Sequence, residues 1–189
     1  MIQEALYKVT HNQDLSYDLA KVTMNQIMSG EIEAVPMAGF LCALAAKGAT
    51  VEEVTAFATV MREKAGAVPH EGTVLEIVGT GGDEANTFNI STTASFIIAA
   101  AGVPVAKHGN RSVSSKCGAA DLIEALGGKL ELDGAQNEVV LNKTNMCFMF
   151  APVYHQAMKY AGPVRKALGV RTVFNSLGPL ANPAGSTVD

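Results

Sequence analysis

Residues 74–107 read VLEIVGTGGDEANTFNISTTASFIIAAAGVPVAK, and this stretch decides the predicted fold. Its two ends, Val74–Val78 and Val103–Lys107, are short apolar runs with β-branched residues, which is typical of buried strands. Between them, residues 91–102 form an apolar segment of helical length that Gly102 would end. A strand, a helix and a second strand in this order predict two parallel strands with a crossover helix.

The same alternation continues downstream. Residues 119–128 and 135–144 predict two further helices, and Cys147–Phe150 is another apolar run. Strands that alternate with helices indicate an α/β fold with a parallel-rich sheet. In such sheets ligands bind where the strands end and the following loops gather, so the loops after the two predicted strands form the candidate site.

Residues 1–65 have a helical pattern throughout. Apolar residues recur near helical spacing, and Thr50 followed by Glu53 predicts a capping box. The stretch GAVPHEGT, residues 66–73, has two glycines and a proline, as linkers do. We therefore predict a helical domain over 1–65, a linker over 66–73 and the first part of an α/β domain over 74–189.

Composition and charge exclude several classes of protein. Of the 189 residues, 48% are hydrophobic and 17% are charged, which is the balance of a folded globular protein. The 14 Lys and Arg against 18 Asp and Glu give a formal net charge of -4, which argues against nucleic acid as a partner. The longest apolar run, FIIAAAGVPVA, is too short to span a bilayer, so we expect no membrane partner. Cys42, Cys117 and Cys147 form no CxxC pair, which is typical of a protein of the reducing cytoplasm.

The first loop, Gly79–Thr92, has the features of a phosphate-binding turn. Three glycines directly after a strand let backbone N–H groups approach an anion closely. Ser91 and Thr92 then stand at a helix start, where hydroxyls and the positive end of the helix dipole favour phosphate. The loop is neither a Walker loop nor a GxGxxG motif. Taken alone, it is explained equally well as an ordinary tight turn with a Ser/Thr cap.

The second loop, KHGNRSVSSKCG over Lys107–Gly118, is rich in cations and hydrogen-bond donors. Lys107, Arg111 and Lys116 have no carboxylate within the loop, and unpaired cations are costly unless they meet an anion or water. Two such loops, each followed by a helix start, indicate a ligand with more than one phosphate, whereas a solvated, flexible loop is the alternative interpretation. The loop's further donors are Gly109, Asn110, Ser112, Ser114 and Ser115.

Three strings of the sequence resemble the anthranilate phosphoribosyltransferase family. They are VGTGGDEANTFNIST, KHGNRSVSSKCGAADLIEALG and FMFAPVYHQAMKYAGPVRKALGVRTVFNSLGPLANPA. The similarity runs in order from the helical N-terminus to the last residue. It implies a nucleoside-phosphorylase-like phosphoribosyltransferase fold, with a small N-terminal helical domain, an incomplete α/β domain and a homodimer formed through the helical domain.

The resemblance also implies a reaction and its residues. Anthranilate would react with phosphoribosyl pyrophosphate to give N-(5-phosphoribosyl)anthranilate and pyrophosphate, a step of tryptophan synthesis, with Mg²⁺ as the ion. The implied catalytic residues are Lys107, Asn110 and Arg165, anthranilate would contact Gly79, Asn110 and Arg165, and Ser91 would hold magnesium. The implied contacts of phosphoribosyl pyrophosphate are Gly79, Gly82, Asp83, Thr87, Asn89, Ser91, Thr92, Lys107, His108, Gly109, Asn110, Arg111, Ser112, Val113, Ser114, Ser115 and Ala119.

The chemistry of the implied residues fits this reaction. Departure of pyrophosphate leaves an oxocarbenium-like centre, so the leaving group must be neutralised and the amine held in line. Lys107 and Mg²⁺ suit the first task, and the guanidinium of Arg165 can bind the anthranilate carboxylate through two hydrogen bonds. The aromatic amine is nucleophilic when neutral, so no general base is assigned. As alternatives, Arg165 is a solvated helix residue and His155 is a packing or capping histidine.

The resemblance implies a longer chain as well. The family's adjacent Asp-Glu pair, its main magnesium ligands, would follow Asp189, so we expect a fragment with most of the phosphate loops, little activity and an unsatisfied sheet edge. Two other functions stay open. One is another phosphoribosyl- or nucleoside-processing enzyme of the same fold, whose phosphate loops would differ from KHGNRSVSSK. The other is a non-catalytic relative that binds nucleic acid, which the net charge of -4 disfavours.

Overall fold

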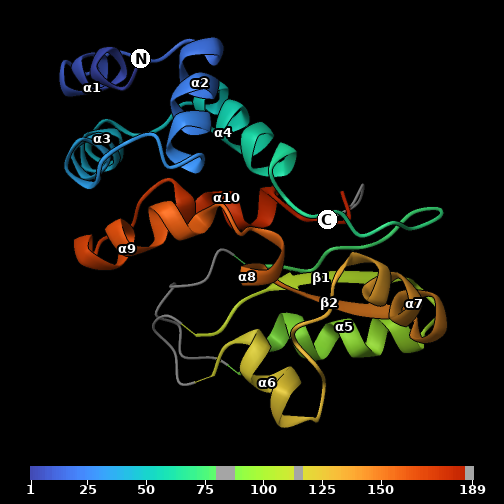
Figure 1. Cartoon of the computed structure of the whole chain (residues 1–189). Coiled ribbons are helices and arrows are strands. Elements are labelled where there is room, and N and C mark those ends of the chain that lie inside the picture. The colour runs from blue at the N-terminus through green and yellow to red at the C-terminus, as the bar shows by residue number, and fades with distance from the viewer. Residues whose placement is uncertain (80–87, 113–116, 186–189) are drawn as a thin grey trace. The chain divides into compact units, whose positions relative to one another are not determined.

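The structure is a computed structural model that describes residues 1–79, 88–112 and 117–185 (Figure 1). In this part of the chain helices dominate, and two short strands pair in parallel. Among the described helices, none combines the length and the apolar character that crossing a membrane requires.

The chain divides into two compact units, each of which is assembled from two segments. The first unit contains Met1–Ala65 and Gln156–Ala181, and the second contains Gly66–His155 together with the chain from Asn182. Residues 156–181, which the predicted division assigns to the α/β part, thus pack with the N-terminal helices. The predicted division into 1–65, 66–73 and 74–189 stays a prediction.

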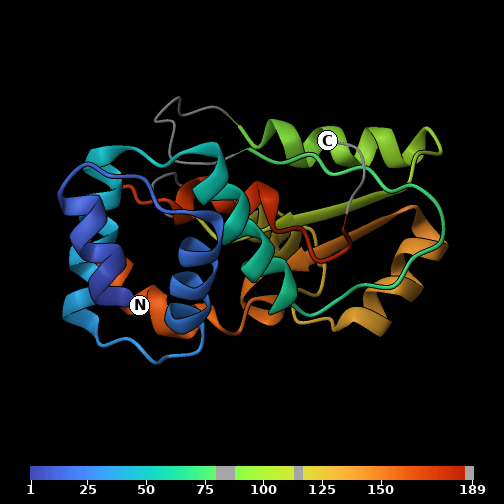
Figure 2. The ribbon, with the colours of Figure 1, turned by 90° about the horizontal axis from the view of Figure 1, so that it is seen from above.

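The first unit is helical. In Figure 1 and Figure 2, α1 lies beside α3 and α2 lies beside α4, and these pairs make the largest helix contacts of the unit. Phe40 and Phe57 are fully buried between them, with ring centroids 6.5 Å apart in an edge-to-face arrangement. The helices are α1 (Ile2–Thr10), α2 (Tyr17–Met28), α3 (Ala34–Lys47), α4 (Val51–Glu63), α9 (Met158–Leu168) and α10 (Phe174–Leu180).

A buried carboxylate joins three segments of this unit. Thr50 caps α4, and the predicted capping box with Glu53 is confirmed. The Glu53 side chain, 0% exposed, also accepts hydrogen bonds from the backbone N–H of Leu15 at 2.8 Å and from Lys47 Nζ at 3.1 Å. Burial opposes the charge on Lys47, but hydrogen bonds to Asp14 and Glu53 outweigh it and raise the pKa of Lys47.

The second unit contains the parallel strands. β1 (Val105–Gly109) pairs with β2 (Met146–Phe150) in a register that places Val105 opposite Met146 and Gly109 opposite Phe150. The predicted helices over 91–102, 119–128 and 135–144 are present, and the apolar run over 147–150 lies in β2. The helices of this unit are α5 (Ile90–Ala100), α6 (Ala119–Ala125), α7 (Gly134–Thr144) and α8 (Ala151–Tyr154).

The two faces of the strands belong to two apolar clusters. Figure 1 shows α5 and α6 on one side of the strands, and there Val105, Met146 and Phe148 pack with residues of these helices. On the other face, Ala106 and Met149 pack with residues of α7 and α8. Since side chains of a strand alternate between faces, both faces of β1 and β2 are covered, as expected for a parallel sheet.

The predicted strand at Val74–Val78 is wrong. Leu75 makes a single parallel bridge with Val105, and there the ladder ends. Beyond it, side chains replace the backbone partners: Glu76 accepts the N–H of His108, and Lys107 Nζ donates to the carbonyl of Ile77. The strand predicted at Val103–Lys107 is present but shifted to Val105–Gly109, because Pro104 has no N–H to offer the ladder.

We expect the substitution Glu53→Gln to lower the free energy of unfolding by about 2–4 kcal/mol, because it removes one charge of a buried pair while Lys47 stays buried. Urea unfolding followed by circular dichroism measures the change. Glu63→Gln is the matched control, since Glu63 pairs with Lys21 at the surface and should leave the unfolding midpoint nearly unchanged. Equal midpoints for both variants would contradict the structural role of Glu53.

Candidate functional site

The start of α5 and the start of α6 lie next to each other in the second unit. Asn89, which precedes α5, donates from its side-chain amide to the carbonyl oxygen of Gly118 at 3.3 Å and to Sγ of Cys117 at 3.4 Å. Gly118 is the N-cap residue of α6, as predicted. Asn89 therefore contacts two residues, Cys117 and Gly118, that lie 28 and 29 positions later in the sequence, beside the loop that follows β1.

The loop after β1 is held against α6 by one carboxylate. Asp121 Oδ2 accepts the backbone N–H of Gly118 at 2.8 Å and that of Ser112 at 3.1 Å. These two bonds, followed by the bond from Arg111, hold the pKa of Asp121 below its usual value. The carbonyl of Asn110 in turn accepts the N–H of Ala120 at 3.2 Å. The loop thus has a defined course up to Ser112.

Arg111 is paired, contrary to the expectation of an unpaired cation cluster. Its guanidinium contacts Asp121 at 2.9 Å and Glu124 at 2.8 Å and 2.9 Å. Both carboxylates lie on α6, outside the loop, and a count of charges within the loop could not include them. Lys116, the third cation of the cluster, lies outside the described residues.

Two glycines let the segments approach this closely. A Cβ atom at Gly118 would clash with the backbone nitrogen of Ser112 and with the carbonyl carbon of Arg111. A Cβ atom at Gly109 would lie 2.9 Å from the ring of Phe148. Only glycine fits at either position without displacing a neighbour.

Lys107 is buried, with 2% of its surface exposed. Its ammonium donates to the carbonyl oxygen of Ile77 at 2.5 Å, in the segment that leads into the glycine-rich loop. Desolvation lowers the pKa of Lys107, and the negative charge of Glu76 opposes this shift. The predicted catalytic lysine therefore connects the end of β1 with the start of the first loop, and Gly79 is exposed just beyond it.

Glu76 and His155 belong to the same neighbourhood, although neither was predicted as a site residue. Both carboxylate oxygens of Glu76, which is 1% exposed, lie 3.2 Å from the backbone nitrogen of His108. The rings of His108 and His155 are buried with their centroids 4.9 Å apart. The sequence signal for Glu76 was a single acidic residue inside an otherwise apolar run, and it was interpreted as part of a strand.

The start of α5 presents the predicted magnesium ligand. Ser91 is half-buried, and among the residues that the structure describes, none hydrogen-bonds its hydroxyl. Thr92 is buried. The described residues contain no group of three His, Cys, Asp or Glu side chains that could hold a metal ion. A hydroxyl oxygen is a ligand type that suits Mg²⁺.

Arg165 lies on α9 and belongs to the first unit, whereas Lys107 and Asn110 belong to the second. Its guanidinium is half-buried and stands 5.1 Å from the centroid of the Phe174 ring. Burial lowers the pKa of Arg165. A guanidinium held over an aromatic face is more ordered than the solvated helix residue of the alternative interpretation.

Six of the predicted contacts lie outside the described residues. The structure brings eight of the predicted contacts together at the C-terminal end of β1 and at the starts of α5 and α6. They are Asn89, Lys107, His108, Gly109, Asn110, Arg111, Ser112 and Ala119. The six outside are Gly82, Asp83, Thr87, Val113, Ser114 and Ser115.

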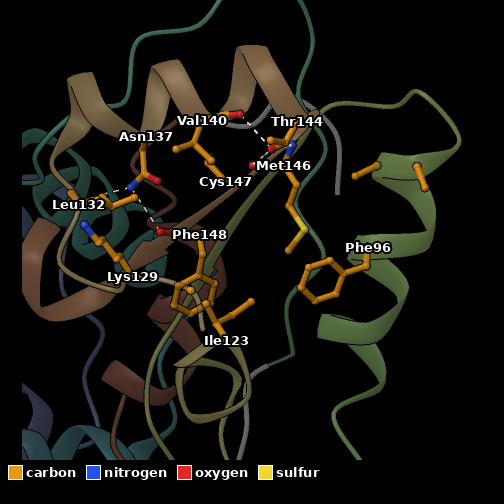
Figure 3. A pocket seen from close by; sticks show the side chains of 13 residues that line it. Phe96, Ile123, Lys129, Leu132, Asn137, Val140, Thr144, Met146, Cys147 and Phe148 are labelled. Carbon is orange, nitrogen blue, oxygen red and sulfur yellow. Dashed lines mark hydrogen bonds between the residues drawn. The ribbon is translucent and has the colours of Figure 1, made fainter. Parts of the chain in front are cut away.

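A cavity of about 640 Å³ lies elsewhere in the second unit. Figure 3 shows Phe96, Ile123, Met146 and Phe148 around it, so its walls come from α5, α6 and β2 and are mostly apolar. The wall from α7 includes Asn137, whose amide is tied to the carbonyl of Phe148 at 3.3 Å. The cavity is lined by none of the predicted site residues, and it does not suit a multiply charged phosphate ligand.

Two family models match the chain. The helical bundle domain of a glycosyl transferase family matches residues 3–65, and the α/β domain of a glycosyl transferase family matches residues 71–189. The anthranilate phosphoribosyltransferase of Ruminiclostridium cellulolyticum is 59% identical over 100% of this chain and 55% of its own length. That of Lachnoclostridium phytofermentans is 56% identical over 100% of this chain and 56% of its length. The chain therefore spans a little more than half the length of these relatives.

Solved structures agree with this assignment. The crystal structure of anthranilate phosphoribosyltransferase (TrpD) from Thermus thermophilus matches with a TM-score of 0.91 at 46% identity, over 96% of this chain and 56% of that chain. The enzyme of Saccharomyces cerevisiae in complex with PRPP and Mg matches with a TM-score of 0.89 at 28% identity, over 97% of this chain and 55% of that chain. The predicted resemblance and fold class, a small helical domain with an α/β domain, are confirmed. With both domains matched along its length, the chain belongs to the glycosyl transferase family that joins a helical bundle domain to an α/β domain and is similar throughout to anthranilate phosphoribosyltransferases.

Proposed function

We propose that this chain serves the transfer of the phosphoribosyl group from phosphoribosyl pyrophosphate to anthranilate, which yields N-(5-phosphoribosyl)anthranilate and pyrophosphate. One observation supports it above the others: the loop after β1 is tied to the starts of α5 and α6 by Asn89 and Asp121. This brings the starts of two helices and the loop that follows the strand of the buried Lys107 to one place. The relatives that support the substrates extend well beyond this chain, so turnover by the 189 residues alone is expected to be weak.

The pyrophosphate leaving group is assigned to Lys107 and to the start of α5. An ammonium has three donors, of which the carbonyl of Ile77 engages one. Because Lys107 is buried, its charge is weakly screened and would act strongly on a nearby anion. Ser91 is assigned as the residue of this chain that would bind Mg²⁺. When bound, the ion supplies further neutralisation of the leaving pyrophosphate.

Anthranilate is assigned to Arg165, Asn110 and Gly79. The guanidinium of Arg165 offers two parallel N–H donors, which match the geometry of a carboxylate. Its position over the Phe174 ring limits its freedom and reduces the entropy lost on binding. We also expect a homodimer formed through the helical domain and a cytoplasmic location, which size-exclusion chromatography with light scattering and cell fractionation can test.

We expect Lys107→Met to raise the dissociation constant of phosphoribosyl pyrophosphate with Mg²⁺ by about tenfold or more, since a hydrogen bond to a charged group contributes about 1.5–3 kcal/mol. Isothermal titration calorimetry on the chain measures this constant. Lys143→Met is the matched control, because Lys143 is exposed on α7, and it should bind like the wild type. If the two variants bind equally well, Lys107 does not contact the ligand.

We expect Arg165→Lys to raise the dissociation constant of anthranilate by about tenfold, which corresponds to about 1.4 kcal/mol. The reason is that a lysine cannot form two parallel hydrogen bonds to a carboxylate. The intrinsic fluorescence of anthranilate provides the measurement. Binding of phosphoribosyl pyrophosphate should stay within about twofold of wild type, a difference below about 0.5 kcal/mol. Lys166→Gln, the exposed neighbour on α9, is the control. A parallel loss of both ligands would show that Arg165 has a structural role instead.

A further inference from the structure

We propose that Glu76 is a positioning residue of the candidate site: its buried carboxylate holds the backbone at His108, so that the end of β1 stays beside the segment whose Ile77 carbonyl accepts from Lys107, where both predicted phosphate loops begin. The link from these loops to phosphate rests on the proposed function. The positioning of Lys107 and His108 does not.

The role of Glu76 follows from where the parallel ladder stops. Leu75 makes both bonds of a parallel bridge, donating to the carbonyl of Pro104 at 2.9 Å and accepting from the N–H of Ala106 at 3.0 Å. In a regular parallel ladder, Ile77 would next bond to the carbonyl of Ala106 and to the N–H of His108. Three of the four backbone groups in these two bonds have side-chain partners instead: the carbonyls of Ile77 and Ala106 and the N–H of His108.

Side chains occupy each of the three positions instead. The N–H of His108 donates to the Glu76 carboxylate, and the carbonyl of Ile77 accepts from Lys107 Nζ. The carbonyl of Ala106 accepts from the side-chain amide of Asn182 at 3.0 Å. These three backbone groups therefore keep hydrogen-bond partners where the ladder ends, which is also where the two predicted phosphate loops begin.

A buried carboxylate is retained here at a cost. Removing a carboxylate from water is unfavourable by several kcal/mol unless charges and hydrogen bonds compensate. Here the N–H of His108 and the charge of Lys107 contribute to this compensation. In return, the charge of Glu76 favours the charged state of Lys107 and opposes the lowering of its pKa by desolvation.

Glu76 reaches both loops without lying in either. The Ile77 carbonyl that Lys107 contacts is two residues from Gly79, and His108 is two residues from Asn110. A change at Glu76 would therefore shift the ammonium and the backbone donors of the second loop together. This distinguishes a positioning residue from a ligand contact, which would alter one interaction alone.

The test compares Glu76→Gln with Glu76→Asp and with the control Glu71→Gln, which removes the charge of an exposed glutamate five residues earlier. The amide signal of His108 and the titration of the Lys107 side chain are followed by NMR in each variant. Glu76→Gln should move the His108 amide signal and lower the pKa of Lys107 further, and Glu76→Asp, which keeps the charge, should restore the pKa. Unchanged signals in Glu76→Gln would overturn the proposal.

The wild-type chain gives a second readout that does not depend on a variant folding. Titration of Lys107 should move the side-chain carboxyl carbon signal of Glu76, because the charge of Glu76 acts on the ammonium of Lys107. An unmoved carboxyl signal would overturn the positioning role.

Calorimetry with phosphoribosyl pyrophosphate and Mg²⁺ then links the positioning to the function. Glu76→Gln should raise the dissociation constant by about fivefold or more, about 1 kcal/mol in coupling, while Glu71→Gln stays at the wild-type value. If the wild type does not bind phosphoribosyl pyrophosphate but Glu76→Gln shows the expected NMR changes, the positioning role of Glu76 is supported and the proposed function is contradicted. If the wild type binds and Glu76→Gln binds equally well, Glu76 does not position the phosphate loops.

Discussion

The candidate site depends on the way the hydrogen-bond ladder between residues 75–77 and β1 ends. After the parallel bridge between Leu75 and Val105, side chains take the place of backbone groups as hydrogen-bond partners. After Leu75, the backbone of β1 bonds to the carboxylate of Glu76 and to the amide of Asn182, and the ammonium of Lys107, a residue of β1, bonds to the carbonyl of Ile77. A continued ladder would have kept the two segments about 4.7–4.9 Å apart, which is the usual spacing of paired strands. Because side chains bond to three of these backbone groups, the ladder can end here without leaving those groups unpaired, and the two loops can start at the same edge.

The same device recurs in both units. Glu53 accepts the N–H of Leu15 and of Thr50, and Asp121 accepts the N–H of Gly118 and of Ser112. In each case a carboxylate on one element accepts backbone hydrogen bonds from residues on another segment or at a helix start. Such charge-assisted bonds are stronger than neutral ones and depend on direction, so they define the course of segments that have few apolar contacts.

Charge is arranged locally in a protein that is acidic overall. With a net charge of -4, no long-range positive field gathers anions. Lys107 instead stands in a buried position, where its charge acts over a short range, and Arg111 is engaged by two carboxylates of α6. This arrangement suits a small ligand that enters a shaped site, and the similarity to anthranilate phosphoribosyltransferases agrees with it. The large apolar cavity beside Phe96 and Phe148 is separate from this chemistry.

The sequence by itself determined the helical N-terminal part, the alternation of helices with strands over residues 91–150, the capping box of α4, the motifs of the glycine-rich and cationic loops, and the family. These depend on local patterns and on motifs of contiguous residues, which can be read without a fold. Only the tertiary structure decided that residues 74–78 form a bridge instead of a strand, that Arg111 is paired and that Lys107 is buried, because the partners Glu76, Asp121 and Glu124 come from other elements. It also decided that residues 156–181 pack with the helices of the N-terminal part. A pattern along the chain specifies which side chains are apolar or charged, whereas the pairing of charges and of backbone groups depends on distances that only folding sets.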